Sequence, residues 1–171
     1  MKRLLFLGLF TVNSYANITD IHYFDANFTQ VIVDDQNKTL HYKGHIQAAK
    51  PQYALWQYNE PINKKVYITP SKVVIVEPEL EQAIVKKISR NFDFFSLIKN
   101  AKKIDNEHYL TKFDNKEYKI DMKNNILQTI SYKDEFDNSV KIIFSDVNEK
   151  KKIAQKTFIP HIPQDYDLIK E

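Results

Sequence analysis

The chain has 171 residues, no cysteine and a formal net charge of +3. Without Lys2 and Arg3, residues 17–171 carry 23 basic and 22 acidic side chains, and this near balance argues against a nucleic acid or an anionic membrane as a partner. The length suits one domain with a hydrophobic core of its own.

Catalytic motifs that depend on glycine or cysteine are missing. Gly44 is the only glycine after residue 16, so neither a G-x-G-x-x-G loop nor a G-x-S-x-G elbow is present. His41 and His45 would lie about 13 Å apart on one strand face, too far to share a metal without other ligands between them. We therefore predict no enzyme, no metal and no cofactor, with an enzyme of unrecognised site as an open alternative.

Residues 1–16 have the three parts of a secretory signal peptide. A basic start is followed by the apolar run Leu4–Phe10 and by Ser14-Tyr15-Ala16, which suits cleavage after Ala16. The alternative is an uncleaved anchor or a buried first helix. Since no cysteine follows for acylation, we expect residues 17–171 to form a single soluble domain in the periplasm.

Alternation of apolar and polar residues predicts a series of strands. Residues 22–33 place Phe24, Ala26, Phe28 and Ile32 on one face. After a turn at 34–37, residues 40–48 alternate in the same way. Proline in Lys50-Pro51 interrupts the strand, and a further run carries Ala54, Trp56 and Tyr58 on one face.

The next segments are also rich in β-branched residues. Residues 64–69 and 72–77 predict a hairpin that ends at Pro78. Residues 81–88 fit a helix or a strand, and the neighbouring strands favour a strand.

One segment changes to a helical period. In residues 92–101 the apolar side chains of Phe94, Leu97, Ile98 and Ala101 recur at helical spacing, which predicts an amphipathic helix. Asn91 suits its N-cap and Asp93 its first turn.

The rest of the chain predicts a meander. Five strands are expected, at 107–113, 116–122, 126–133, 139–146 and 151–159. Turn pairs such as Asp114-Asn115 and Asn124-Asn125 separate them. Short strands at this spacing indicate an antiparallel barrel or a strongly curved sheet, so the fold class is mainly β with little helix.

Several motifs occur together in a known order. They are Phe28-Thr29-Gln30, a strand with Gly44-x-Ile46, K-P-x-Y-x-x-W from Lys50 to Trp56, Glu60-Pro61, Glu77–Ala83, Phe94–Ile98 and a closing Phe158-Ile159-Pro160. In this order the chain resembles the outer-membrane lipoprotein carrier proteins, the LolA family. The resemblance covers most of residues 17–171, but only Asn17–Ile21 precede the first strand, where family members usually have a helix of several turns.

The resemblance implies a fold and a function. The fold would be an incompletely closed, curved antiparallel β half-barrel whose hydrophobic concave face is covered by one or more short helices. The protein would be a monomeric carrier that accepts acylated lipoproteins from an inner-membrane ABC transporter and delivers them to an outer-membrane acceptor. A lipid- or lipoprotein-sensing regulator on the same scaffold is the alternative.

The resemblance and the alternation together suggest a site. Lys50 occupies the place of a basic residue, usually arginine, that latches the lid in the family; an ordinary lysine at a strand edge is the alternative. Apolar and aromatic side chains of the predicted sheet and helix are expected to line an acyl-chain cavity, unless they are plain core. These are Phe24, Phe28, Leu40, Tyr42, Ile46, Trp56, Tyr58, Val74, Val76, Phe94, Leu97 and Ile98.

Overall fold

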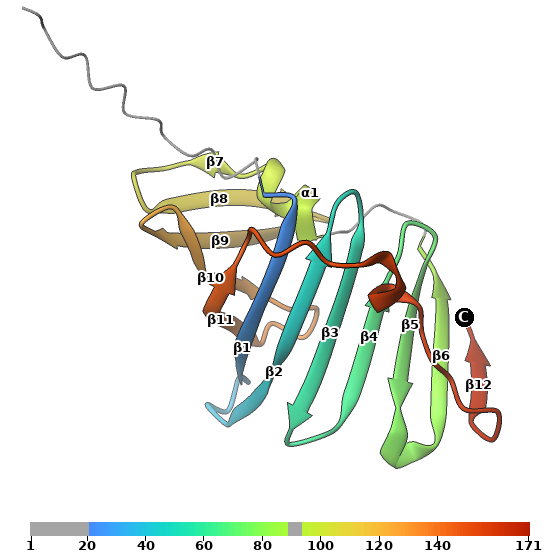
Figure 1. Cartoon of the computed structure of the whole chain (residues 1–171). Coiled ribbons are helices and arrows are strands. Elements are labelled where there is room, and N and C mark those ends of the chain that lie inside the picture. Colours follow the sequence, from blue (N-terminus) through green and yellow to red (C-terminus); the bar gives the residue numbers. More distant parts are fainter. Residues whose placement is uncertain (1–20, 89–93) are drawn as a thin grey trace, which may run out of the picture.

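The first half of the chain forms a regular antiparallel meander (Figure 1). The computed structural model describes residues 21–88 and 94–171, so the predicted signal peptide, the N-cap Asn91 and Asp93 lie outside the described residues. The strands are β1 (Tyr23–Val33), β2 (Thr39–Ala49), β3 (Tyr53–Glu60), β4 (Lys64–Ile68), β5 (Lys72–Glu77) and β6 (Gln82–Lys87), with a 3₁₀ turn at Pro78–Leu80 before β6. The ambiguous segment 81–88 is therefore a strand.

The second half returns to the starting strand from the other side. Helix α1 (Phe94–Lys99) leads into β7 (Lys102–Lys103), β8 (His108–Phe113), β9 (Lys116–Lys123), β10 (Ile126–Lys133) and β11 (Ser139–Asn148). Strand β11 pairs with β1, which makes β1 the junction between the two halves. The result is one open sheet of 12 strands in the order β12-β6-β5-β4-β3-β2-β1-β11-β10-β9-β8-β7. The prediction of an incompletely closed, mainly antiparallel half-barrel is confirmed.

The hairpins turn where the sequence predicted. Both residues of Asp114-Asn115 and of Asn124-Asn125 have positive φ, between 48° and 62°. Two successive left-handed residues match the twist of antiparallel strands, and asparagine and aspartate tolerate this conformation better than other non-glycine residues.

The predicted strand at 151–159 is wrong. In its place the chain crosses the sheet as an irregular segment with a 3₁₀ helix at Gln155–Phe158 and ends in β12 (Asp167–Lys170), which pairs in parallel with β6. The Asn148 side chain accepts hydrogen bonds from the backbone N–H groups of Lys150 and Lys151 at 3.1 and 3.0 Å, and this turn ends β11. Ile153 and Phe158 are the two buried residues of the segment, a spacing that no strand alternation would give.

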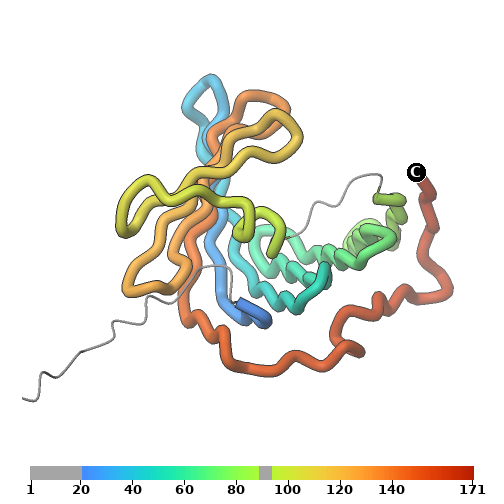
Figure 2. The backbone as a smooth tube through the Cα atoms, turned by 90° about the horizontal axis from the view of Figure 1, so that it is seen from above, coloured from blue at the N-terminus to red at the C-terminus, as the bar shows by residue number. Residues whose placement is uncertain are grey.

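The sheet is covered differently on its two faces. We call the face that contacts α1 the front face and the other the back face. On the front face the apolar residues of β1–β4 pack with α1 and with β9–β11. On the back face, β3–β6 pack against the C-terminal segment through Leu55, Tyr67, Ile153 and Phe158. Figure 2 shows this segment running beneath the strands of the first half.

Val74 and Val76 lie on the back face, which corrects the prediction that they line an acyl-chain cavity together with Trp56. Val74 is paired with Tyr67, and both belong to the back-face cluster. The neighbouring Val73 points to the opposite face of the strand and packs against the front-face core. Strand β5 carries apolar side chains on both of its faces, so the sequence did not indicate which of these faces lies towards α1.

Gly44 is required by close packing rather than by its backbone conformation. A Cβ atom at this position would lie 2.0 Å from the backbone oxygen of Gln57 and 2.6 Å from the ring of Phe28. The absence of a side chain therefore lets the Phe28 ring lie over β2 and reach Trp56 and Tyr58, each with a ring-centroid distance of 5.1 Å.

Asp25 fixes the start of the C-terminal segment to the back face. Its carboxylate, with only 9 % of its side chain exposed, accepts hydrogen bonds from Lys151 Nζ and from Gln47 Nε2, both at 2.8 Å. Burial alone would raise the pKa of Asp25, but the bonds from Lys151 and Gln47 and the nearby His45 outweigh it, so the pKa lies below its ordinary value.

A lowered carboxyl pKa stabilises the fold above the ordinary value of 3.8, and this contribution is lost as the pH falls through the folded-state pKa. We expect Asp25→Asn to lower the free energy of unfolding by about 1 kcal/mol at neutral pH, and the difference from wild type to shrink as the pH falls below 3.8. Urea unfolding at several pH values measures this. Asp165→Asn, at an exposed position, is the control; a difference for Asp25→Asn that does not change with pH would contradict the assignment.

Candidate functional site

A cavity of about 210 Å³ lies between α1 and the front face of the sheet. Its walls come from both halves of the sheet and from the helix. The lining residues are Gln30, Trp56, Tyr58, Val66, Ile68, Phe94, Leu97, Tyr118, Ile130, Tyr132 and Ile142. Most of this wall is apolar or aromatic, which suits a hydrocarbon ligand better than a charged one.

Helix α1 closes the cavity at one end of β1. Phe94, Phe95, Leu97 and Ile98 are buried, and the ring of Phe94 lies 4.8 Å from that of Phe24 and 6.4 Å from that of Phe144. In the described part of α1, Phe94–Lys99, four of six side chains are buried, so the position of the helix depends on these apolar contacts. A cover held in this way is able to leave when another apolar group takes its place.

The predicted cavity residues fall into four groups. Trp56, Tyr58, Phe94 and Leu97 line the cavity. Phe24, Phe28, Ile46 and Ile98 are buried in the front-face core and do not line the cavity. Leu40 and Tyr42 lie farther along β2, where Leu40 is 45 % exposed, while Val74 and Val76 are on the back face.

The second meander supplies wall residues that the sequence analysis missed. Tyr118, Ile130, Tyr132 and Ile142 come from β9, β10 and β11. Alternation within these strands was a usable signal, since Tyr118, Ile120 and Met122 are all buried in the front-face core. A register shift between Leu127 and Thr129 places Leu127 on the same face as Ile130, so alternation along the whole of β10 would have failed.

Lys50 belongs to the turn between β2 and β3. This turn lies at the end of the sheet where α1 is located (Figure 1). The nearby Phe24 pairs with Ala48 and contacts Phe94. Lys50 also borders a recess of about 430 Å³ next to Tyr53 and Phe158. Its position is compatible with the predicted latch, which stays a prediction.

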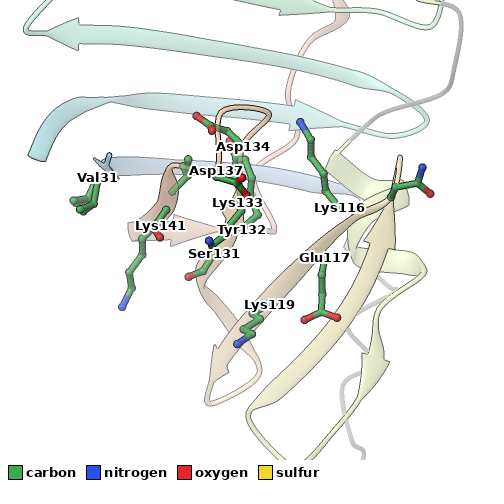
Figure 3. Close-up of a pocket in the computed structure, with 14 residues that line it drawn as sticks. Val31, Lys116, Glu117, Lys119, Ser131, Tyr132, Lys133, Asp134, Asp137 and Lys141 are labelled. Atoms are coloured by element: carbon green, nitrogen blue, oxygen red, sulfur yellow. The ribbon is translucent and has the colours of Figure 1, made fainter. Parts of the chain in front are cut away.

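A second, larger recess is of another kind. It has a volume of about 840 Å³ and lies behind β9–β11. Charged side chains such as Lys119, Lys141 and Glu117 line it (Figure 3) together with the apolar side chains of Val31, Val33 and Val140. Both signs of charge are present, so this surface does not offer a field of one sign.

Other chemistry finds no support in residues 21–88 and 94–171. No group of three or more histidine, cysteine or acidic residues there is arranged to hold a metal ion. His45 contacts Asn27 at 2.9 Å and Asp25 at 3.3 Å. None of the helices in this part of the chain is long and apolar enough to cross a membrane.

Comparison with known proteins points to one family. Residues 19–161 match the family described as outer membrane lipoprotein carrier protein LolA. The outer-membrane lipoprotein carrier protein of Campylobacter jejuni is 37 % identical over 169 residues, 99 % of either chain. That of Wolinella succinogenes is 30 % identical over 172 residues and covers both chains fully. The crystal structure of a LolA superfamily protein from Nitrosomonas europaea has a TM-score of 0.51 at 10 % identity, covering 82 % of this chain and 91 % of its own.

Trp56 is the only tryptophan of the chain and lines the cavity, so it reports on a ligand there. We expect a stearic acid with a nitroxide near its methyl end to quench most of the Trp56 fluorescence. The control is Trp56→Phe combined with Phe136→Trp, because Phe136 is 76 % exposed in the turn between β10 and β11. Equal quenching in both proteins would show that the probe does not enter the cavity.

Proposed function

The chain belongs to the family of outer-membrane lipoprotein carrier proteins, and from this premise we propose that it holds lipoprotein acyl chains between α1 and the front face of the sheet. The observation that carries the proposal is the apolar cavity closed by a six-residue helix. The carried ligand would replace the helix as the cover of the front face.

Energetics require a covered binding site. An acyl chain of about fifteen methylenes costs on the order of 12 kcal/mol to expose to water, at roughly 0.8 kcal/mol for each CH₂. The carrier must offset most of this cost while the lipoprotein is in transit. Aromatic walls such as Trp56 and Phe94 provide large apolar areas for this purpose.

The size of the cavity indicates that it must open. At about 210 Å³ it is smaller than the roughly 300–1,000 Å³ of ordinary small-molecule sites. We infer that α1 moves away from Phe24 and Phe144 as chains enter, and returns after delivery. The closed form buries apolar surface when no ligand is bound, which keeps the energetic difference between the two forms small.

Membership of the family also suggests where the protein acts and which partners load and unload it. We propose that residues 1–16 direct export and that the protein acts in the periplasm as a monomer without an energy source of its own. An ABC transporter of the inner membrane would load it, and an acceptor at the outer membrane would receive the lipoprotein. No catalytic step is part of this proposal.

Lys50 is proposed as a latch that favours the closed form. Lysine offers point donors without the planar fork of arginine, so it would hold α1 more weakly than arginine would. A weak latch suits a carrier that must open on contact with its partners.

The carrier function is tested by adding the purified protein to spheroplasts that hold newly made lipoproteins. We expect a soluble one-to-one complex with acylated lipoprotein. Leu97→Asp places a charge in the cavity wall and should abolish the release of lipoprotein from the spheroplast membrane. Leu168→Asp, on the exposed β12, should leave this release unchanged.

Circular dichroism must show that both variants are folded. If the lipoproteins stay on the membrane with folded wild-type protein and a confirmed transporter, the carrier function is refuted, and the lipid-sensing alternative becomes the hypothesis to pursue.

The latch is tested by changing Lys50 in both directions. Removing one hydrogen-bonding group should shift the equilibrium towards the open form by about two- to tenfold, so Lys50→Leu should bind a labelled acyl peptide more tightly and release it more slowly. Lys50→Arg should have the opposite effect. If Lys50→Leu binds and releases the acyl peptide as the wild type does, the latch hypothesis is refuted.

A further inference from the structure

The cavity has an apolar end and a polar end. Along the front face of β1, the residues from the α1 end are Phe24, Ala26 and Phe28, and the next is Gln30. The Phe24 ring contacts α1. Gln30 therefore lies two positions beyond the aromatic core, and Tyr58 and Tyr132 line the cavity together with it.

The side-chain amide of Gln30 has hydrogen-bond donors that face the cavity. The Tyr58 hydroxyl donates a hydrogen bond to Gln30 Oε1 at 3.0 Å, which orients the amide and leaves both Nε2 protons available. Gln30 is 9 % exposed, and within residues 21–88 and 94–171 its Nε2 has no hydrogen-bond partner. Among those residues, the only fully buried side-chain atom without a hydrogen-bond partner is Glu149 Oε1. Gln30 Nε2 has no partner there either, so it is not fully buried. Because Gln30 lines the cavity, this atom is reachable from the cavity.

Tyr132 adds a hydroxyl at the same end. Its ring lies 4.9 Å from that of Tyr118, and the hydroxyl has no hydrogen-bond partner in the described part of the chain. Burial, with smaller effects of Tyr118 and Asp134, raises the pKa of Tyr132 to about 12. The hydroxyl therefore stays protonated and able to donate at any physiological pH.

A hydrocarbon chain gives such donors nothing to bind, whereas an acyl chain ends in a carbonyl oxygen. Leaving a donor without a partner when a ligand excludes water is costly, so a carrier for plain hydrocarbon would gain from apolar residues at these positions. An ester or amide oxygen accepts hydrogen bonds and carries no charge, which matches an amide and a neutral hydroxyl. The ammonium group of Lys64 lies over the Tyr58 ring, 4.7 Å from its centroid, and Lys64 is not among the residues that line the cavity.

We propose that Gln30 and Tyr132 form a carbonyl-binding subsite, which takes the ester or amide oxygen where an acyl chain joins its lipid head. This inference rests on the proposed function and adds the part of the ligand that the cavity recognises. The subsite fixes the direction of the ligand: the head lies near Tyr58 and Tyr132, and the chains extend towards α1. Tyr58 is a positioning residue, since it orients the Gln30 amide.

The test compares two ligands whose hydrocarbon chains have the same length. One is a peptide whose cysteine carries a dipalmitoylglyceryl group, and the other is its dihexadecyl ether analogue, which lacks both ester carbonyls. Binding is followed by Trp56 fluorescence. We expect wild type to prefer the ester by about fivefold, the effect of one well-placed hydrogen bond. Gln30→Leu and Tyr132→Phe should each bring the ratio of the two affinities close to one.

Tyr42→Phe is the matched control, because it removes a hydroxyl from the same face outside the cavity lining and should keep the ester preference. Equal binding of both ligands by wild type overturns the subsite but leaves the carrier function intact. So does an ester preference that survives when Gln30→Leu and Tyr132→Phe are combined in one folded protein. Failure of wild type to bind either ligand refutes the proposed function itself. If Gln30→Leu does not fold, the affinity ratio of Tyr132→Phe decides.

Discussion

The packing of Phe24 against Phe94 and Phe144 is the contact on which the rest of the structure depends. Phe24 belongs to β1, Phe144 to β11 and Phe94 to α1, so one aromatic cluster joins both halves of the sheet and the helix. Withdrawal of α1 would expose such side chains, at roughly 1.5–3 kcal/mol each. The helix therefore stays in place until an apolar ligand covers the same surface.

The two faces of the sheet differ in how firmly they are covered. On the back face, the Asp25–Lys151 ion pair and the buried Phe158 fix a long segment that ends in a paired strand. On the front face, a six-residue helix provides the cover. This asymmetry fits the proposed movement of α1, which would uncover the front face and leave the back-face contacts in place.

Much of the fold was predictable because single-faced alternation is a strong signal. Phe24, Phe28, Ile46 and Trp56 were correctly placed on one face, and the paired asparagines marked the turns. Alternation fails where a strand is apolar on both faces, as in β5, and where an apolar residue packs from an irregular segment, as with Phe158. Gln30 was overlooked as a wall residue because a polar side chain in an apolar wall departs from the pattern used to find that wall.

The sheet is open, so it has two edges with unpaired backbone groups. One edge is β7, only Lys102–Lys103, and the other is β12, whose four residues include Asp167 and Lys170. Short, charged edge strands discourage the addition of a strand from another molecule. A barrel would remove its edges by closing but would lose the ability to widen. The open sheet therefore has edges that are poor templates for aggregation, which suits a carrier whose proposed cycle would uncover the apolar front face.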